Sequence, residues 1–278
     1  MADDWRWDET LYRGSAAYYG AGRLPYPPQV ASAFAETFGL DGTQRLLDVG
    51  CGPGSLTLQL APHVALAIGV DADRDMIAAA KTAAERGGTT NVEWRCMRAE
   101  ELPADLGRFA LVTFAQSFHW FEQGKVAAAL RAMLEPGGAC VHVHATTHRG
   151  DDSDDPLEHP RPPYDQVDAL VRSYLGPARR AGRGLRHVRT PANEESALRG
   201  AGLTGPTRIE LDTARIVTRG IDDVVAATFS LSGTTPHLFG DDVGRFEADL
   251  RALLRDAAPD GRFSERTRDV ALEIWRVP

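Results

Sequence analysis

The chain has 278 residues, of which 43% are hydrophobic and 25% are charged, and these proportions exclude a disordered or fibrous class. Its formal net charge of -8 opposes attraction to a phosphate backbone, so we expect no nucleic-acid partner. No segment reaches the roughly 18 uninterrupted apolar residues of a membrane span. Residues 1–10 lack the basic and apolar regions of a leader, so we expect a cytoplasmic protein without a membrane partner.

Two local features could indicate binding sites, but we interpret both as ordinary structural features. The three cysteines, Cys51, Cys96 and Cys140, are an odd number without CxxC spacing, which indicates neither a disulfide framework nor a zinc site. We interpret them as reduced and buried, and we expect no metal site. A basic stretch at residues 179–189 is interpreted as solvated surface.

The first half of the chain predicts a parallel sheet. Residues 1–28 are rich in aromatic side chains and are interpreted as an N-terminal lid, and helical spacing follows over 29–38. From residue 44, short apolar runs alternate with helical patterns, which is typical of βαβ units. The expected strands are 45–49, 65–70, 92–97, 110–114 and 138–144, and the expected helices between them are 55–60, 74–85 and 125–133.

Beyond the core, assigned to residues 29–148, the pattern changes. Residues 149–192 are interpreted as an insertion or cap, with a helix at 164–175. Residues 193–278 are expected to complete the sheet and to add cap helices. The elements expected in this last part are strands at 203–212, 214–218 and 270–277 and helices at 221–231 and 241–257.

The most informative residues surround Gly50, where an apolar strand, a glycine-rich turn and a helix start follow one another. Glycines at alternate positions let the backbone approach a ligand closely. The spacing is GxGxG rather than the GxGxxG of dinucleotide folds, and Asp48 would repel a pyrophosphate. The ammonium of S-adenosylmethionine would instead compensate this buried carboxylate. Asp71, directly after the next strand, is placed to accept hydrogen bonds from ribose hydroxyls in either cofactor.

Five segments in order resemble the successive motifs of class I S-adenosylmethionine-dependent methyltransferases. They are DVGCGPG (48–54), GVD (69–71), RAEELP (98–103), QSFHW (116–120) and LEPGG (134–138). The opening Tyr19-xxx-Arg23-xx-Tyr26-Pro27 is similar to the small-molecule, type 11-like subgroup. The resemblance covers about residues 44–144 and is weak beyond them.

The resemblance implies an α/β, Rossmann-like sheet of seven strands with the last strand antiparallel, helices on both faces and a helical cap. S-adenosylmethionine, with S-adenosylhomocysteine as product, would lie across the carboxyl ends of the first strands. The cofactor residues implied by position are Tyr19, Arg23, Asp48, Gly50, Cys51, Gly52, Asp71, Ala72, Met76, Ala99, Glu100, Gln116 and Ser117. Many relatives carry Gly-Asp where this chain has Met97-Arg98, so Glu100 or backbone groups would have to contact the adenine amino group.

Methyl transfer is an in-line displacement. Alignment of the reacting atoms supplies most of the rate enhancement, and a general base is helpful but not obligatory. His119, just after the fourth strand, is the leading candidate for a base and His144 the second, although either histidine could be an ordinary packed side chain. Trp120 and Phe121 are expected to form an aromatic wall against a planar acceptor or the sulfonium, with ordinary core packing as the alternative. Phe229 lies in a helix expected to roof the acceptor site.

We therefore interpret the chain as an S-adenosylmethionine-dependent methyltransferase for the O-, N- or C-methylation of a small-molecule acceptor in natural-product tailoring. Two alternatives stay open: a nicotinamide-dependent oxidoreductase, which would share the ribose acid, and an S-adenosylmethionine-binding protein without catalysis. Nothing in the sequence specifies an oligomeric state.

Overall fold

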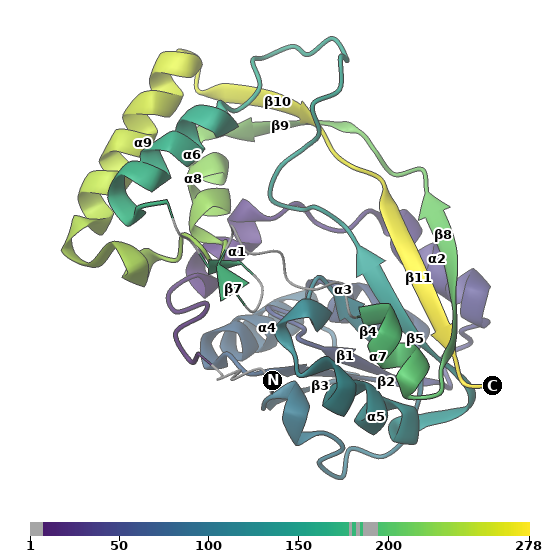
Figure 1. The fold of residues 1–278 in the computed structure, drawn as a ribbon. Helices are drawn as coiled ribbons and strands as arrows, with labels where there is room; N and C mark the ends of the chain where they lie inside the picture. The colour runs from purple at the N-terminus through teal and green to yellow at the C-terminus, as the bar shows by residue number, and fades with distance from the viewer. Residues whose placement is uncertain (1–7, 178–179, 182–183, 186–193) are drawn as a thin grey trace.

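A seven-stranded mixed sheet organises the molecule (Figure 1). The structure, a computed structural model, describes residues 8–177, 180–181, 184–185 and 194–278. The strands follow the order β3-β2-β1-β4-β5-β11-β8. Their bounds are β1 (Arg45–Val49), β2 (Leu66–Asp71), β3 (Val92–Cys96), β4 (Phe109–Ala115), β5 (Leu134–His144), β8 (Thr204–Leu211) and β11 (Val270–Arg276). The first five are parallel neighbours, whereas β11 pairs antiparallel with both β5 and β8. The expected architecture, with the last strand antiparallel, is confirmed.

Helices cover both faces of the sheet because alternate side chains of each strand point to opposite faces. The helices of this core are α2 (Pro28–Phe38), α3 (Ser55–Leu60), α4 (Arg74–Gly87), α5 (Gln123–Met133) and α7 (Glu194–Gly200). On one face, α2 and α3 bury Phe34 and Leu60 against the strands. On the other face, α5 and α7 bury Leu130 and Leu198. The sheet lies between these two helical layers, and the loops at the carboxyl ends of its strands carry the candidate site.

A cap with its own apolar core forms a separate layer (Figure 1). It contains α6 (Tyr164–Leu175), α8 (Ile221–Phe229), α9 (Val243–Ala257) and the antiparallel pair of β9 (Ile216–Gly220) and β10 (Arg262–Arg266). Its centre is aromatic: the ring centroids of Phe239 and Phe246 lie 4.0 Å apart in a stacked arrangement, and Phe229 meets the Phe246 ring edge-on at 5.6 Å. The cap core is therefore distinct from the two cores on the sheet.

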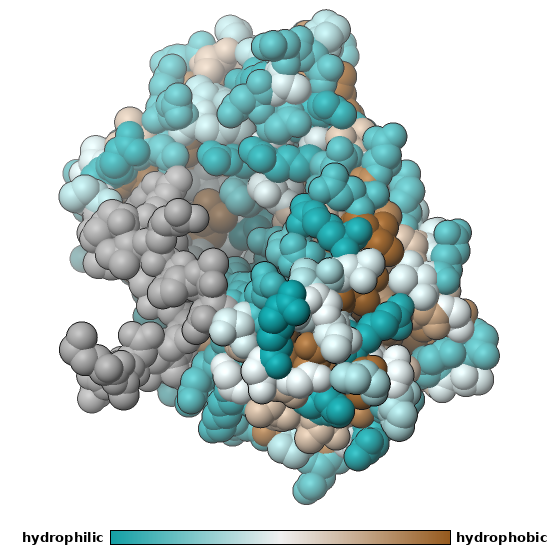
Figure 2. Space-filling view, turned by 45° about the vertical axis from the view of Figure 1, so that its right-hand side comes forward, coloured by the Kyte–Doolittle hydropathy of each residue, from teal (hydrophilic) through white to brown (hydrophobic). Residues whose placement is uncertain are grey.

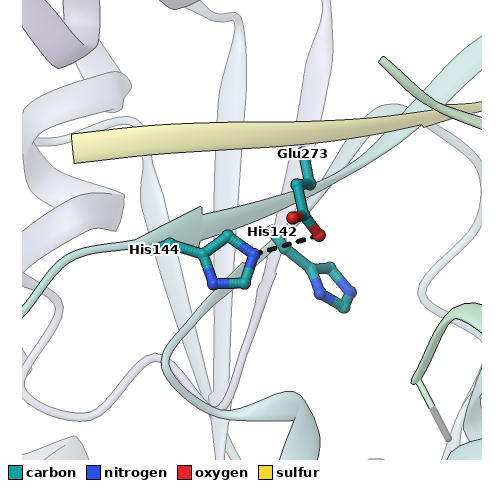
Figure 3. A group of neighbouring side chains, drawn as sticks. All are labelled: His142, His144 and Glu273. Carbon is teal, nitrogen blue, oxygen red and sulfur yellow. Dashed lines mark ion pairs between the residues drawn. The ribbon is translucent and has the colours of Figure 1, made fainter. Parts of the chain in front are cut away.

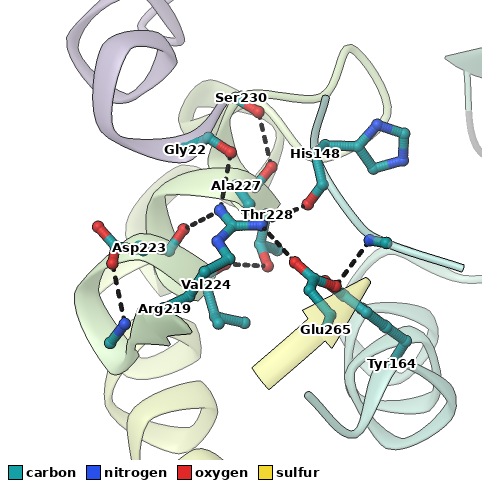
Figure 4. Close-up of polar contacts among 12 residues, drawn as sticks. Gly22, His148, Tyr164, Arg219, Asp223, Val224, Ala227, Thr228, Ser230 and Glu265 are labelled. Atoms are coloured by element: carbon teal, nitrogen blue, oxygen red, sulfur yellow. Dashed lines mark hydrogen bonds and ion pairs between the residues drawn. The ribbon is translucent and has the colours of Figure 1, made fainter. Parts of the chain in front are cut away.

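A buried ion pair joins the cap to segments that are distant in sequence (Figure 4). Nη1 of Arg219 lies 3.2 Å from Oε1 of Glu265, and the two side chains are only 3% and 2% exposed. The other partners are the carbonyl groups of Gly22, His148 and Asp223, which accept from Arg219, and the Gly150 N–H and Tyr164 hydroxyl, which donate to Glu265. One buried cluster thus holds the end of helix α1 (Ala16–Gly22), residues 148–150 and the β9–β10 pair together.

Helix α1 (Ala16–Gly22) packs tightly on α8. An ideal Cβ on Gly22 would lie 2.4 Å from the carbonyl carbon of Ala226, closer than real Cβ atoms approach. We expect Gly22→Ala to lower the free energy of unfolding by about 1–3 kcal/mol, the usual cost of overpacking, as measured by chemical denaturation. Gly20→Ala is the control, because a Cβ there meets nothing within 4 Å. Equal losses in the two variants would contradict this account of the contact.

Three findings differ from or extend the sequence expectations. The interpretation of all three cysteines as buried is wrong for Cys96, which is exposed because β3 is an edge strand. Helices α1 and α7 and strand β10 were not expected, since none of them shows a periodic apolar pattern in the sequence. The basic stretch at residues 179–189 lies mostly outside the described residues, as do residues 1–7 of the expected lid.

The visible face of the molecule is mainly hydrophilic (Figure 2). Among the side chains that the structure describes, Ile216 is the large hydrophobic residue with a high exposed fraction, 51%. Within the same residues, no helix combines the length and apolar character needed to cross a bilayer.

Candidate functional site

A pocket of about 750 Å³ opens where β1, β2 and β4 end. Residues that directly follow these strands line it: Gly50 after β1, Ala72 after β2 and Gln116 after β4. The carboxyl ends of parallel strands meet at one edge of the sheet, which is where ligands bind in open α/β folds. The volume is in the range of small-molecule sites.

The glycine loop contributes in two different ways. Gly50 and Gly52 have φ angles of 70° and 55°, in the left-handed region that favours glycine. An ideal Cβ on Gly50 would lie 2.5 Å from Cβ of Ser117, so this glycine permits the loop to pack against the end of β4. A Cβ on Gly52 would meet no protein atom within 4 Å, although Gly52 lines the pocket. Gly52 therefore leaves space for a ligand.

The carboxylate of Asp71 stands at the pocket with its geometry fixed by backbone groups. The Gly52 N–H donates to Oδ2 at 2.8 Å, and the Asp73 N–H donates to Oδ1 at 2.9 Å. Burial raises the pKa of Asp71 to about 6, against these two hydrogen bonds, which lower it. Each carboxylate oxygen keeps a further lone pair, so Asp71 can also accept hydrogen bonds from a ligand hydroxyl.

Asp48 lies behind the glycine loop and not on the pocket wall. Its side chain is fully buried and accepts hydrogen bonds from the hydroxyls of Thr57 and Thr113, at 2.6 and 2.8 Å. Burial raises its pKa to about 6, and the two hydroxyls oppose that shift. Asp48 thereby joins β1, α3 and β4, and its charge acts on the pocket from a distance.

The end of β4 carries a backbone strain of the kind that accumulates at functional sites. Gln116 has a φ angle of 59° without being glycine. Its neighbour Ser117 is buried and donates from its hydroxyl to the carbonyl of Val49 at 2.6 Å. This bond fixes the turn after β4 against the end of β1, so the two pocket-lining loops hold one another in place.

Aromatic side chains of the N-terminal segment and of the short helix after β4 form a further wall of the pocket. Tyr12, Tyr19 and Trp120 line the pocket, and the rings of Tyr12 and Trp120 meet edge-to-face with centroids 5.8 Å apart. Burial raises the pKa of Tyr12 well above its ordinary value, so its hydroxyl stays neutral. The wall is therefore mainly aromatic, and Glu9 of the same segment also lines the pocket.

At the end where the resemblance places adenine, Glu100 is already engaged. Its Oε1 accepts from the N–H of Glu122 at 2.9 Å, and its Oε2 lies 3.5 Å from the guanidinium of Arg98. Both Glu100 and Arg98 line the pocket. The carboxylate retains acceptor capacity, and Arg98 adds a positive charge that the family pattern lacks.

A second, smaller cavity of about 290 Å³ adjoins the first. Gln116 and Ser117 line both cavities, whereas His119, His142 and His144 line only the second among the pockets described here. Burial lowers the pKa of His119 below its ordinary value, and the carboxylate of Glu194 and the nearby His142 modify that shift in opposite directions. The two expected histidines thus lie together, across Gln116 and Ser117 from the main pocket.

Most of the residues implied by the family motifs meet at the main pocket. Those that line it are Tyr19, Gly50, Gly52, Asp71, Ala72, Met76, Ala99, Glu100, Gln116, Ser117 and Trp120. Those outside its lining are Arg23, Asp48, Cys51, His119, His144 and Phe229. The guanidinium of Arg23 is bonded to the hydroxyl and carbonyl of Ser230 and stacks over Tyr19. Phe229 is fully buried in the cap core.

Several lining residues were not singled out from the sequence. They are Glu9, Leu11, Tyr12, Val70, Asp73 and Ala115. A signal existed for two of them: Tyr12 belongs to the dense N-terminal aromatic set, and Asp73 caps α4 by accepting from the N–H groups of Asp75 and Met76. Phe121, expected beside Trp120 in the aromatic wall, also lines the pocket, as do Met97 and Arg98, at which the chain departs from the family pattern.

Comparison with known proteins places residues 46–138 within a family described as a methyltransferase domain. The ubiquinone biosynthesis O-methyltransferase of Coxiella burnetii is 34% identical over 96 residues, which are 34% of this chain and 41% of that protein. The uncharacterized methyltransferase YcgJ of Bacillus subtilis is 36% identical over 77 residues, 28% of this chain and 30% of that protein. The chain therefore matches less than half the length of each of these relatives.

Solved structures extend the similarity to most of the chain. The crystal structure of YcgJ superposes with a TM-score of 0.51 at 19% identity, covering 89% of this chain and 97% of that one. A putative methyltransferase from Bacillus halodurans gives the same TM-score at 18% identity, covering 90% and 99%. At such identities the superpositions show a shared fold.

Proposed function

We propose that this protein transfers a methyl group from S-adenosylmethionine to a small-molecule acceptor, because residues 46–138 match the model of a methyltransferase domain. The main pocket is the proposed cofactor site. S-adenosylhomocysteine would be the product that remains there after transfer.

The observation that carries the proposal is the bond between the Gly52 N–H and the Asp71 carboxylate at the pocket wall. It holds an acceptor for ribose hydroxyls beside a loop position where a side chain would enter open space. The glycine loop and the buried charge of Asp48 favour a cationic amino-acid end over a pyrophosphate. Ala72 and Met76 add an apolar surface for a flat adenine ring.

When bound, the cofactor supplies an electrophilic methyl group on a sulfonium. The protein's part is alignment, which is worth about 7–11 kcal/mol in well-oriented systems. Gln116 and Ser117 stand between the two cavities and would hold the reacting groups in line. Tyr12 and Trp120 form the aromatic wall against which a planar acceptor would pack, and their faces favour positive charge by about 0.5–2 kcal/mol.

Calorimetric titration with S-adenosylmethionine, S-adenosylhomocysteine and NAD tests the cofactor assignment. We expect both adenosyl ligands to bind, and Asp71→Ala to weaken that binding by about 10- to 100-fold, because it removes hydrogen bonds to a charged group. Asp41→Ala is the control, since Asp41 is exposed and only caps its own turn. Binding of NAD alone would reject the methyltransferase proposal and favour an oxidoreductase.

His119 is the proposed base for an acceptor hydroxyl or amine. It follows Gln116 and Ser117 on the short helix η3 (Phe118–Trp120), and a ring nitrogen would take the proton as the methyl group is transferred. His144 is less suited, because its Nε2 lies 3.2 Å from the carboxylate of Glu273.

Replacing His119 by asparagine is expected to lower kcat by about 10²-fold, the lower end of the effect of a general base, while the affinity for S-adenosylhomocysteine stays unchanged. Single-turnover kinetics with an acceptor found by screening would measure the first quantity and calorimetry the second. An unchanged kcat would show that His119 is not the base. A loss of cofactor affinity would show that His119 supports the structure of the cofactor site instead.

We further propose a role in natural-product tailoring, in which the oxygen, nitrogen or carbon of an aromatic or otherwise planar acceptor is methylated. Support comes from the aromatic wall of Tyr12 and Trp120, which offers such a molecule a flat contact area. Screening acceptors of this shape for turnover distinguishes an enzyme from a protein that only binds the cofactor.

A further inference from the structure

We propose that His142, His144 and Glu273 form a binding site for a divalent transition-metal ion, such as zinc, beside the second cavity. The expectation of no metal site rested on the cysteines, and these three residues lie elsewhere. One potential ligand atom from each of them falls within 4.8 Å of the other two. The proposal is independent of methyl transfer and can fail or hold without it.

The sheet itself brings the three side chains together (Figure 3). His142 and His144 are two residues apart on β5, so they point to the same face. Glu273 on β11 stands directly opposite His142 in the antiparallel register, and its carboxylate lies between the two imidazole rings. Because all three residues belong to central strands, their backbone positions are set by the core and need no ordering when an ion binds.

His142 carries the observation that points to a ligand. Its side chain is buried, and within the described residues its Nε2 has no hydrogen-bond partner. A buried ring nitrogen without a partner costs free energy of the order of 1–3 kcal/mol. The other ring nitrogen, Nδ1, lies 3.3 Å from Oε2 of Glu194. With its proton on Nδ1 and directed to that carboxylate, His142 presents a lone pair at Nε2.

Outer partners of this kind are the usual support of metal-binding histidines, since they fix the tautomer and the ring orientation. Glu273 has one as well: Nη1 of Arg208 donates to its Oε1 at 2.8 Å, which leaves Oε2 for an ion. Two of the three proposed ligands thus already have the carboxylate or guanidinium neighbour that such ligands require.

The distances fit a small ion. Nε2 of His144 lies 3.2 Å from Oε2 of Glu273, but not along the direction of a hydrogen bond. Zinc bonds of about 2.0–2.2 Å to nitrogen and oxygen give a tetrahedron with edges of about 3.3 Å. The separations of up to 4.8 Å close to that value when each side chain moves by less than about 1 Å.

The donor set also specifies the class of ion. Imidazoles favour zinc, copper, iron and nickel, whereas magnesium and calcium prefer oxygen ligands alone. Two histidines and one carboxylate leave at least one coordination position open, as in catalytic zinc sites and in non-haem iron sites. His119 lines the same cavity as His142 and His144, so that open position would be reached through the second cavity.

Metal binding is tested on untagged full-length protein after treatment with a chelator. Titration with Co²⁺, followed by the visible absorption of the bound ion, and with Zn²⁺, followed by metal analysis after dialysis, should give one ion per chain. Zinc should also raise the melting temperature, because it binds the folded state preferentially. Neither readout depends on methyl transfer.

The variants His144→Ala and Glu273→Gln should weaken Co²⁺ binding by about 100-fold or more, and Glu194→Gln by about 10- to 100-fold. His63→Ala is the control, since His63 lies on the short helix η1 (Ala61–His63), away from the cluster. Circular dichroism without metal establishes that each variant folds. Three results would each overturn the proposal: no stoichiometric ion in the wild-type protein, undiminished binding in both ligand variants, or binding of Mg²⁺ in preference to Zn²⁺.

Discussion

Replacing Gly52 by valine is expected to abolish measurable binding of S-adenosylmethionine while the protein stays folded. The position lines the pocket, and a Cβ there meets no protein atom within 4 Å. The branched side chain would therefore begin in the space proposed for the ligand. Calorimetry with S-adenosylhomocysteine measures the loss of binding, and thermal unfolding measures the remaining stability.

Gly39→Val is the matched control for this experiment. Gly39 has a φ angle of 59°, close to the 55° of Gly52, and a Cβ there also meets nothing within 4 Å, but it ends α2 away from the pocket. Both variants should lose about 1–2 kcal/mol of stability through the left-handed backbone. Only the change at Gly52 should affect binding. If Gly52→Val binds the ligand normally, the cofactor does not occupy the main pocket as proposed.

Replacing Arg219 by methionine is expected to lower the free energy of unfolding by about 3–5 kcal/mol, because it leaves the Glu265 carboxylate buried without its cation. Both side chains are almost fully buried (Figure 4). The variant also removes donors from three backbone carbonyl groups. Denaturant titration measures the change, and adding Glu265→Gln to the variant should recover part of it by removing the unpaired charge.

Arg251→Met provides the comparison in the same cap. Arg251 pairs with Asp222 and Glu247, but it is 29% exposed and Asp222 is 86% exposed. Solvent screens such pairs, so the loss should stay near or below about 1 kcal/mol. If the two arginine variants were equally destabilised, the burial of the Arg219–Glu265 pair would not be the cause.

Periodicity and motif order predicted the sheet of the core because β1, β2 and β4 are mainly apolar runs between glycine-rich or polar turns. The edge strand β3 (VEWRC) alternates apolar and polar residues instead. β1 (Arg45–Val49) and α3 (Ser55–Leu60) begin and end at the expected residues. The helices α1 and α7 were not predicted, because α1 (AAYYGAG) contains two glycines and α7 (EESALRG) buries Leu198 alone, so neither has a periodic apolar face. Strand β10 (RFSER) has Phe263 as its one apolar residue, so it shows neither an apolar run nor an alternation of apolar and polar residues.

In the candidate site, too, the residues that could be predicted are those whose position depends on local sequence. Asp71 and Gly52 are examples, because the local sequence sets their backbone geometry. Arg23 could not be placed, since its partner Ser230 is 207 residues away. Phe229 sits in the cap core rather than facing the pocket, because the cap helices pack on one another. The pairing of His142 with Glu273 depends on the register of β5 and β11, which no local pattern encodes.

The place of β11 in the sheet has a consequence for synthesis. Residues up to 144 contain all five parallel strands, but the free side of β5 is covered only by β11, at residues 270–276. For the time that the ribosome needs to add more than a hundred further residues, the nascent core carries an open strand edge, a template for pairing with another chain. A ribosome-associated chaperone that covers this edge would raise the yield of folded protein, and stalled chains that end before β11 should aggregate.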